Sequence, residues 1–134
     1  QLDLPLSVEG IRVNLKCQRL HFLHSVAHTL TSELGLLVGR YVIHFSDGKT
    51  DVIELKLGVD FWDWHFDPKH PKATQNSKVA WRGANEAAKR YNKMIQVFKS
   101  TWANPRPGVT VESIDYISAN AGPGPFLIAI TAEP

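Results

Sequence analysis

Residues 38–57 read VGRYVIHFSDGKTDVIELKL, and they consist of two alternating apolar runs joined by the turn Ser46-Asp47-Gly48. Alternation with a period of two is typical of a half-buried β-strand, and a short loop with Asp-Gly between two such runs indicates a β-hairpin. A two-residue turn would place Ile43 opposite Val52, whereas a three-residue loop pairs odd-numbered positions with odd-numbered positions.

Burial chooses between these two loops, because a register shift of one residue turns every side chain of a strand to the opposite face. The three-residue loop gathers the large apolar side chains of both strands on one face, namely Tyr41, Ile43, Phe45, Ile53, Leu55 and Leu57. The sequence therefore predicts a three-residue loop in which Gly48 takes the left-handed conformation of a G1 bulge.

Outside the hairpin, the chain consists of short extended segments separated by turns, with no internal repeat. The apolar pattern predicts strands at residues 11–17, 20–27, 79–81, 109–117 and 126–131, and loops at residues 29–35, 66–78 and 120–125. The apolar parity switches near Glu112, which indicates a β-bulge. The last of these strands is nearly all apolar, so we expect it at the centre of a sheet.

Residues 84–103 fit two patterns. Apolar side chains recur at helical spacing from Tyr91 to Trp102, and residues 84–89 favour a helix by propensity. Residues 95–98, Ile-Gln-Val-Phe, fit a buried strand equally well. With either interpretation, about eight short strands without a βαβ rhythm predict an all-β fold, an antiparallel β-sandwich.

The composition limits the classes of partner. A chain of 134 residues with 43% hydrophobic and 21% charged residues has the size and make-up of one globular domain, so we treat residues 1–134 as a single domain. The net charge of +2 is small and Lys and Arg are scattered, so nucleic acid is not indicated. No apolar run reaches membrane-spanning length, so membrane insertion is not indicated.

Two further features concern the origin of the chain and its cysteine. The sequence opens without Met and without a signal-peptide pattern, so we interpret it as a fragment excised from a larger protein. Its single cysteine, Cys17, excludes an internal disulfide. Because Cys17 lies among alternating apolar positions, we predict a buried and inert thiol.

The hairpin is followed by residues 58–65, Gly-Val-Asp-Phe-Trp-Asp-Trp-His, in which Trp62 and Trp64 share one parity. Flat apolar rings beside carboxylates suit a sugar-binding surface, because a ring covers the C–H face of a pyranose while polar groups bind its hydroxyls. Packing of these rings in the core is the alternative. Phe61 and Trp62 have opposite parities, so only one faces the core, and we expect Trp62 to be partly exposed.

The histidines at positions 21, 24 and 28 raise the question of a transition-metal site. On an extended segment His21 and His24 point to opposite faces and do not share one ion. On a helix His24 would align with His28, but the glutamate of the zinc-protease motif is missing. We therefore predict no metal cofactor and regard a metal-dependent enzyme as the least favoured class.

Acidic residues after the hairpin suggest two other roles, Ca²⁺ binding and glycoside hydrolysis. Asp60, Asp63 and Asp67 would be able to hold a structural Ca²⁺, although their spacing is not that of an EF-hand. A carboxylate pair for glycoside hydrolysis can be assembled from Asp60, Asp63 and Glu86 only by assumption. No nucleophile motif and no phosphate-binding glycine loop is present, so we expect a domain that is not an enzyme.

The chain resembles the galactose-binding-like, jelly-roll type of β-sandwich found in carbohydrate-binding modules, similar to domains attached to secreted bacterial glycoside hydrolases and to FecR-type regulators. The resemblance rests on residues 20–24, 38–48, 63–64, 80–85, 102–107, 114–115 and 127–131. It implies a bacterial protein that is secreted, periplasmic or on the cell surface, with neighbouring domains in a larger polypeptide. It also implies that residues 91–103 form a strand, and that Trp64 and Trp81 serve packing.

The resemblance leaves the polar and aromatic loop residues as candidates for ligand binding, namely Trp62, His65, Asp67, His70, Arg82, Asn85 and Arg106. Arg and Asn beside a Trp are suited to bind vicinal hydroxyls or the carboxylate or sulfate of a sugar. We therefore expect a non-catalytic accessory module that binds a polysaccharide or oligosaccharide. A structural or protein-interaction domain of an extracytoplasmic regulator or envelope assembly is the alternative.

Overall fold

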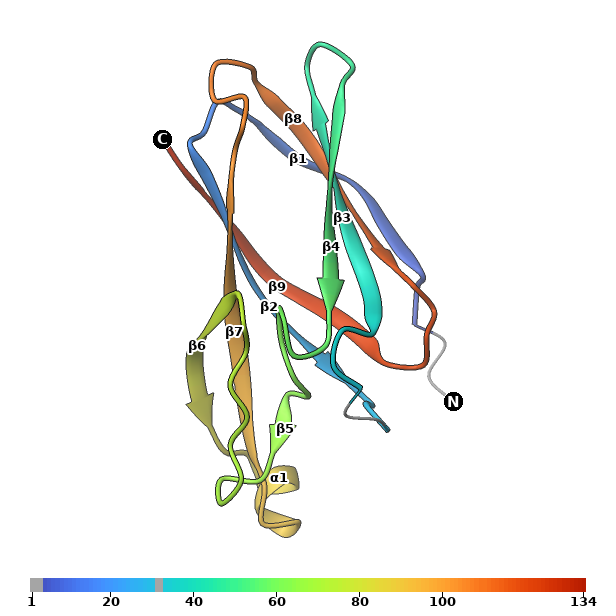
Figure 1. Ribbon diagram of the computed structural model, residues 1–134, viewed down its shortest axis with the longest axis vertical. Coiled ribbons are helices and arrows are strands. Elements are labelled where there is room, and N and C mark those ends of the chain that lie inside the picture. The colour runs from blue at the N-terminus through green and yellow to red at the C-terminus, as the bar shows by residue number, and fades with distance from the viewer. Residues whose placement is uncertain (1–3, 31–32) are drawn as a thin grey trace.

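The computed structural model describes residues 4–30 and 33–134, and these residues form two antiparallel β-sheets packed face to face (Figure 1). The predicted all-β sandwich is therefore confirmed, while the jelly-roll connectivity stays a prediction. The described elements are β1 (Ser7–Leu15), β2 (Arg19–Ala27), β3 (Leu37–Phe45), β4 (Thr50–Lys56), β5 (His65–Phe66), β6 (Ser77–Gly83), α1 (Glu86–Arg90), β7 (Met94–Ala103), β8 (Val111–Ser118) and β9 (Gly124–Glu133).

The first sheet has the strand order β1–β8–β3–β4, and the second has the order β5–β7–β2–β9, with β6 pairing on β7 as well. The core lies between the sheets and includes Cys17, as predicted, although β1 already ends at Leu15. The predicted loops at 66–78 and 120–125 are largely confirmed, whereas residues 31–32 of the predicted loop 29–35 lie outside the described residues. None of the described helices is long and apolar enough for a membrane crossing.

The hairpin of β3 and β4 has the predicted register. Tyr41 pairs with Ile53, so odd positions face odd positions. The backbone N–H of Gly48 donates to the Phe45 carbonyl at 3.0 Å, and Gly48 has a φ of +86°. The three-residue loop with Gly48 in the left-handed region is confirmed, because this register buries the apolar face against the second sheet.

The predicted bulge near Glu112 is also present. His44 pairs with Ser113, but the next residue of β3, Phe45, pairs with Val111. Glu112 is therefore an extra residue in β8, and it is exposed while Val111 and Ile114 on either side of the bulge stay in the core.

The prediction that residues 126–131 form a central strand is wrong. β9 lies at the edge of the second sheet and pairs only with β2 among the described strands. The apolar run is not covered on both faces, because a bulge at Ile128 leaves that side chain 54% exposed. The other apolar side chains of β9 line an open hollow that β9 shares with β1, the edge strand of the first sheet.

The two patterns in residues 84–103 prove to belong to two successive elements. The helix α1 covers only residues 86–90, and β7 begins at Met94. The strand predicted for residues 91–103 is therefore correct from Met94 onward, whereas residues 91–93 precede it, and the propensity of residues 84–89 predicted the short helix. The helical spacing of apolar residues in β7 has no structural counterpart, because pairing with β2 and β6 fixes this segment as a strand.

His24 links the two sheets in the middle of the core. Its ring is fully buried, its Nδ1 is 2.8 Å from the hydroxyl of Tyr41 on β3, and its Nε2 is 2.8 Å from Ser100 Oγ on β7. The Tyr41 ring also stacks on Phe22 at 4.1 Å between centroids. Burial lowers the pKa of His24 to about 3, so the folded protein holds this ring neutral.

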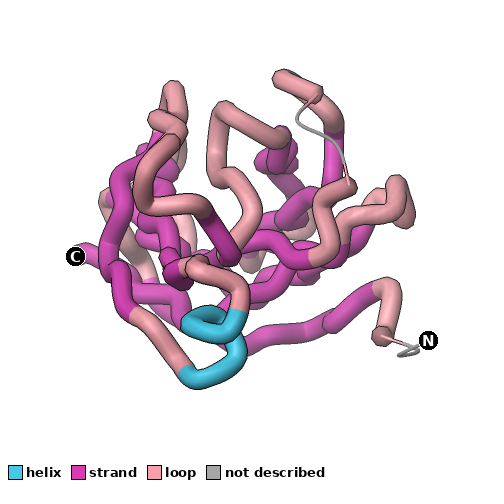
Figure 2. Tube along the Cα trace, turned by 90° about the horizontal axis from the view of Figure 1, so that it is seen from below, coloured by secondary structure: helices cyan, strands magenta, loops and turns pink. Residues whose placement is uncertain are grey.

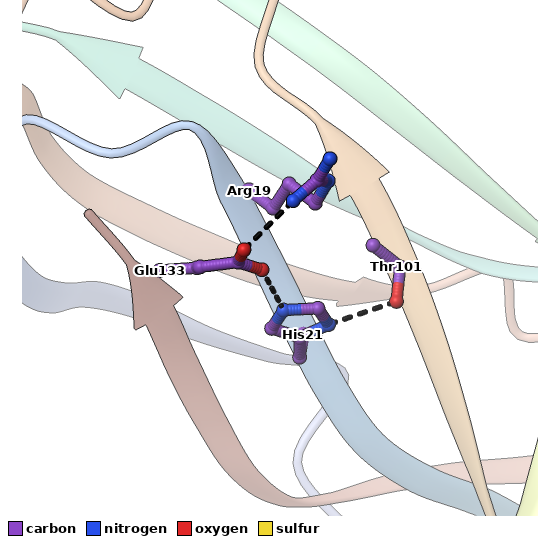
Figure 3. A network of polar contacts seen from close by, with 4 residues as sticks. All are labelled: Arg19, His21, Thr101 and Glu133. Atoms are coloured by element: carbon purple, nitrogen blue, oxygen red, sulfur yellow. Dashed lines mark hydrogen bonds and ion pairs between the residues drawn. The ribbon is translucent and has the colours of Figure 1, made fainter.

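His21 points to the outer face of the same strand, as its parity predicts. Figure 3 shows it between β7 and β9, where Nδ1 lies 2.8 Å from Thr101 Oγ1 and Nε2 lies 2.8 Å from Glu133 Oε2. Arg19 binds the other oxygen of Glu133 at 2.7 Å. Because His21 and His24 lie on opposite faces of β2, they do not bind one metal ion together.

Gly48→Val should destabilise the domain by about 1–2 kcal/mol, because a β-branched residue is strained at positive φ while the space around the Gly48 Cβ position is open. Chemical denaturation measures the effect. Gly108→Val is the matched control, since Gly108 also has open space but no positive φ. Equal stability of the two variants would contradict the bulged loop.

Acidification should destabilise the fold through His24. Its folded pKa lies below its unfolded value of 6.5, so below pH 6.5 the unfolded chain binds a proton that the folded protein excludes. The free energy of unfolding should fall by about 1.4 kcal/mol per pH unit between 6.5 and about 3. Urea denaturation at pH 6 and pH 5 separates this effect from most carboxylate titration.

His24→Gln should flatten that pH dependence while lowering the overall stability. His28→Asn is its control, because His28 is exposed at a φ of +59°, a conformation that Asn tolerates. A wild-type stability that does not change between pH 6 and pH 5 would show that His24 is not held neutral.

Candidate functional site

The loop after β4 fixes the position of Trp62. Gly58 has a φ of +76°, and its N–H donates to the Phe61 carbonyl at 2.8 Å. A Cβ on Gly58 would lie 2.7 Å from Trp62 Cζ2, so the indole packs where only glycine leaves room. The indole Nε1–H donates to the Ala73 carbonyl at 2.9 Å. Phe61 is fully buried and Trp62 is half-buried, which confirms the prediction from their parities.

The next four residues insert between two core strands. β2 and β7 pair as far as His24 and Phe98 and then diverge. In the gap, the Trp64 N–H donates to the Val26 carbonyl at 2.8 Å, and the Gln96 N–H donates to the Trp64 carbonyl at 2.8 Å. Segment 63–66 therefore bridges β2 and β7 with its backbone, and it forms β5 where it pairs with the start of β7.

The predictions for Trp64 and Trp81 need correction. Trp64 is half-buried rather than buried; it stacks on His65 at 4.5 Å and meets the Phe126 ring edge-on at 5.7 Å. Trp81 is 52% exposed, although we expected a packing role. The reason is that β6 pairs only with β7 among the described strands and lies at the margin of the sandwich, where the Trp81 ring packs over Gly83.

A cavity of about 250 Å³ lies beside Trp62 at the end of the molecule that carries α1 and the long loops; Figure 2 looks at this end. We call it the Trp62 cavity. It is lined by Thr29, Trp62, Asp63, His65, Phe66, Asp67, His70, Lys72, Lys93 and Gln96. Four of the seven predicted binding residues are thus brought together, namely Trp62, His65, Asp67 and His70.

Both carboxylates of the cavity are held by neighbouring donors. The Asp63 carboxylate accepts hydrogen bonds from the backbone and hydroxyl of Thr29 and from the His65 N–H. Asp67 accepts from the Lys69 N–H at 2.9 Å and lies 3.1 Å from His70 Nδ1. These two contacts hold the pKa of Asp67 below its usual value, so it is ionised at neutral pH.

Gln96 supplies a polar group that the sequence interpretation missed. The side chain is 2% exposed, and its Nε2 donates to the Asp63 carbonyl at 3.0 Å. Its Oε1 is buried without a hydrogen-bond partner among the described residues. A buried acceptor of this kind favours a ligand that brings a donor. The signal in the sequence was a single polar residue within the apolar run of residues 95–98.

Two lysines of the cavity were also missed. Lys72 Nζ lies 4.7 Å from the centroid of the Trp62 ring, and Lys93 acts on Asp67 through its charge. Neither lysine forms an ion pair with a described residue. A cation–π contact at an exposed site contributes only about 0.5–1 kcal/mol, so the flexible Lys72 side chain is readily drawn to a ligand.

The remaining three predicted residues lie outside the cavity. Arg82 places its guanidinium 4.9 Å from the Phe66 ring and so lies behind the cavity wall. Asn85 caps α1, since its Oδ1 accepts from the Ala88 N–H at 2.8 Å. Arg106 lies at the opposite end of the sandwich, where it pairs with Asp47 in the β3–β4 turn and covers the Phe45 ring (Figure 1).

The acidic residues weighed for Ca²⁺ are not gathered into one site. Asp60 accepts from the Lys56 N–H at 2.8 Å and is nearly buried, while Asp63 and Asp67 have the separate partners given above. Within residues 4–30 and 33–134, no group of three or more His, Cys, Asp or Glu side chains is arranged to hold a metal ion.

Comparison of the chain with protein-family models, with curated proteins and with solved structures finds no match in any of the three. The resemblance to galactose-binding-like domains therefore stays a prediction, and function is inferred from the cavity and its side chains.

Asn85→Ala should lower the free energy of unfolding by about 1 kcal/mol, because it removes the N-cap of α1. Asn85→Asp should restore the stability, since aspartate caps equally well. Thermal and urea denaturation measure both variants. An unchanged stability of Asn85→Ala would show that the cap contributes nothing and would reopen a ligand-binding role for Asn85.

Proposed function

We propose that this domain is a non-catalytic carbohydrate-binding module of a secreted bacterial protein and that it binds polysaccharide in the Trp62 cavity. The observation that carries the proposal is the half-buried Trp62 indole in a cavity that is also lined by Gln96, whose Oε1 is buried without a hydrogen-bond partner among the described residues. An aromatic face matches the C–H face of a pyranose, and an acceptor without a donor matches a sugar hydroxyl.

The positions of the polar groups fit binding better than hydrolysis. A glycosidase needs one carboxylic acid that is protonated at working pH and a second carboxylate across the sugar. The pKa of Asp67 is lowered, which is unfavourable for a general acid, and the Asp63 carboxylate is occupied by Thr29 and His65. Both carboxylates are instead held by neighbouring donors, so neither is placed as a catalytic acid or base.

A protein-interaction domain is the second candidate, and one observation favours it. The edge strands β1 and β9 border a hollow of about 670 Å³ lined mostly by apolar side chains. Leu4, Leu6, Val8 and Ile128 contribute to it and are 57%, 57%, 49% and 54% exposed. Unpaired strand edges beside apolar side chains suit edge-to-edge pairing with a second copy of this chain. Sedimentation velocity over a range of concentrations, without sugar, tests this function.

Trp62→Ala should weaken polysaccharide binding by roughly 1–3 kcal/mol, the cost of losing one stacking aromatic ring. Affinity electrophoresis in gels that contain plant and algal polysaccharides measures the retardation of wild type and variant. Trp81→Ala is the matched control, because it removes an exposed indole outside the cavity. Because Trp62 also packs on Gly58, thermal denaturation must show that the variant is folded, with Trp62→Phe as the conservative substitute.

Wild-type protein that no polysaccharide retards would contradict the proposed function. Equal retardation of wild type and folded Trp62→Ala would place the site elsewhere, and loss of retardation in Trp81→Ala alone would assign it to the outer face of β6.

A further inference from the structure

The charge of the chain is divided unevenly between the end that carries the cavity and the rest. Residues 63–94 contain seven Lys and Arg against three Asp and Glu, whereas the remaining residues contain eight against ten. These residues form β5, β6, α1 and the loops between them, which lie together at one end of the sandwich (Figure 1). The positive charge that looks scattered along the sequence is therefore concentrated at the end of the sandwich that carries the cavity.

Within the cavity, the positive charges are the ones still available to a ligand. The carboxylates of Asp63 and Asp67 are engaged by backbone N–H groups and neighbouring side chains, while Lys72 and Lys93 form no ion pair with a described residue. A ligand that enters the cavity therefore meets two ammonium groups that form no ion pair with a described residue, although Lys93 also acts on the Asp67 carboxylate through its charge. Such a pair favours a group with a negative charge.

The position of Lys72 relative to Trp62 indicates where on the ligand the negatively charged group is attached. The ammonium lies 4.7 Å from the centre of the indole ring, so a ligand that stacks on the indole displaces Lys72 toward its own periphery. A ring with an anionic substituent satisfies both groups, since its C–H face covers Trp62 and its charge draws the displaced ammonium.

Gln96 adds a second requirement. Because Nε2 already donates to the Asp63 carbonyl, Oε1 is left as an acceptor, and a hydroxyl of a ligand is one donor that satisfies it. An isolated anion has no such donor, but an acidic sugar has hydroxyls next to its charged group.

From these contacts we infer that the Trp62 cavity selects a sugar residue with a carboxylate or sulfate group, held by Lys72 and Lys93, with a hydroxyl donating to Gln96. This inference rests on the proposed carbohydrate-binding function and names its ligand class. A uronic acid and a sulfated sugar share the required chemistry. The phosphates of DNA share only the charge, because DNA has no hydroxyl beside the phosphates along its chain.

The test uses the full chain and affinity electrophoresis in matched gels. Polygalacturonate and alginate supply carboxylates, dextran sulfate supplies sulfates, and pectic galactan and dextran are the neutral counterparts. We expect retardation by at least one acidic polysaccharide and little by the neutral ones. The double variant Lys72→Gln/Lys93→Gln should bind the acidic polysaccharide about tenfold more weakly or worse, and added salt should weaken wild-type binding in the same direction.

The control is Lys16→Gln/Lys49→Gln, which removes the same charge from exposed positions in the β1–β2 connection and the β3–β4 turn at the far end. It should keep wild-type binding. Gln96→Leu should also weaken binding of the acidic polysaccharide, and because it removes no charge, its loss should persist at high salt. Melting temperatures of all variants verify that they are folded.

The outcomes distinguish the acidic ligand class from the carbohydrate-binding function on which it rests. Retardation by carboxylated or by sulfated polymers supports the acidic ligand and identifies the anion. Equal retardation by neutral polymers overturns it while leaving the carbohydrate-binding function in place, and no retardation by any polymer overturns both. Equal loss of polysaccharide binding in the two double variants would show that binding follows net charge only. Equal binding of the wild type to single-stranded DNA would show the same, and either result would overturn the inferred acidic sugar ligand.

Discussion

His24 holds the two sheets together at a point where a charged ring would not be stable. Its nitrogens contact Tyr41 on the opposite sheet and Ser100 on β7, the neighbouring strand of its own sheet, so the imidazole joins the two sheets by hydrogen bonds in the core. The edge-on contact of Phe61 with this ring, at 4.9 Å between centroids, extends the constraint to the loop after β4. Since Trp62 follows Phe61 directly, anchoring of Phe61 in the core decides which way the indole faces.

The same region shows how the sandwich provides room for a site. Beyond His24 and Phe98, β2 and β7 no longer bond to each other, and segment 63–66 occupies the gap. The strands satisfy most of their backbone groups through this segment, but the side chain of Gln96 is left with one unpaired acceptor. A polar cavity is thus the consequence of an interrupted strand pairing next to a well-packed core.

Local alternation and turn chemistry were sufficient to predict the hairpin, the Gly48 conformation and the bulge at Glu112, because each depends on neighbours in the chain. The position of β9 was not predictable in this way, since its apolar residues line an open hollow instead of being covered on both faces. The packing role predicted for Trp81 is wrong because β6 has only one described partner strand, which local sequence does not reveal, and the indole is exposed at its margin. Lys72 lies in a loop without periodicity, and only the fold brings it over Trp62.

Segment 63–66 also links occupancy of the cavity to the integrity of the sandwich. Two of the residues that line the cavity, Asp63 and His65, belong to the stretch of backbone that joins β2 to the start of β7. Separation of these strands destroys the cavity, so a bound molecule opposes that separation by a free energy that grows with the ligand concentration relative to Kd. The backbone amides around Val26 and Gln96 are therefore natural sensors of binding, because their exchange with solvent requires the opening that a ligand suppresses.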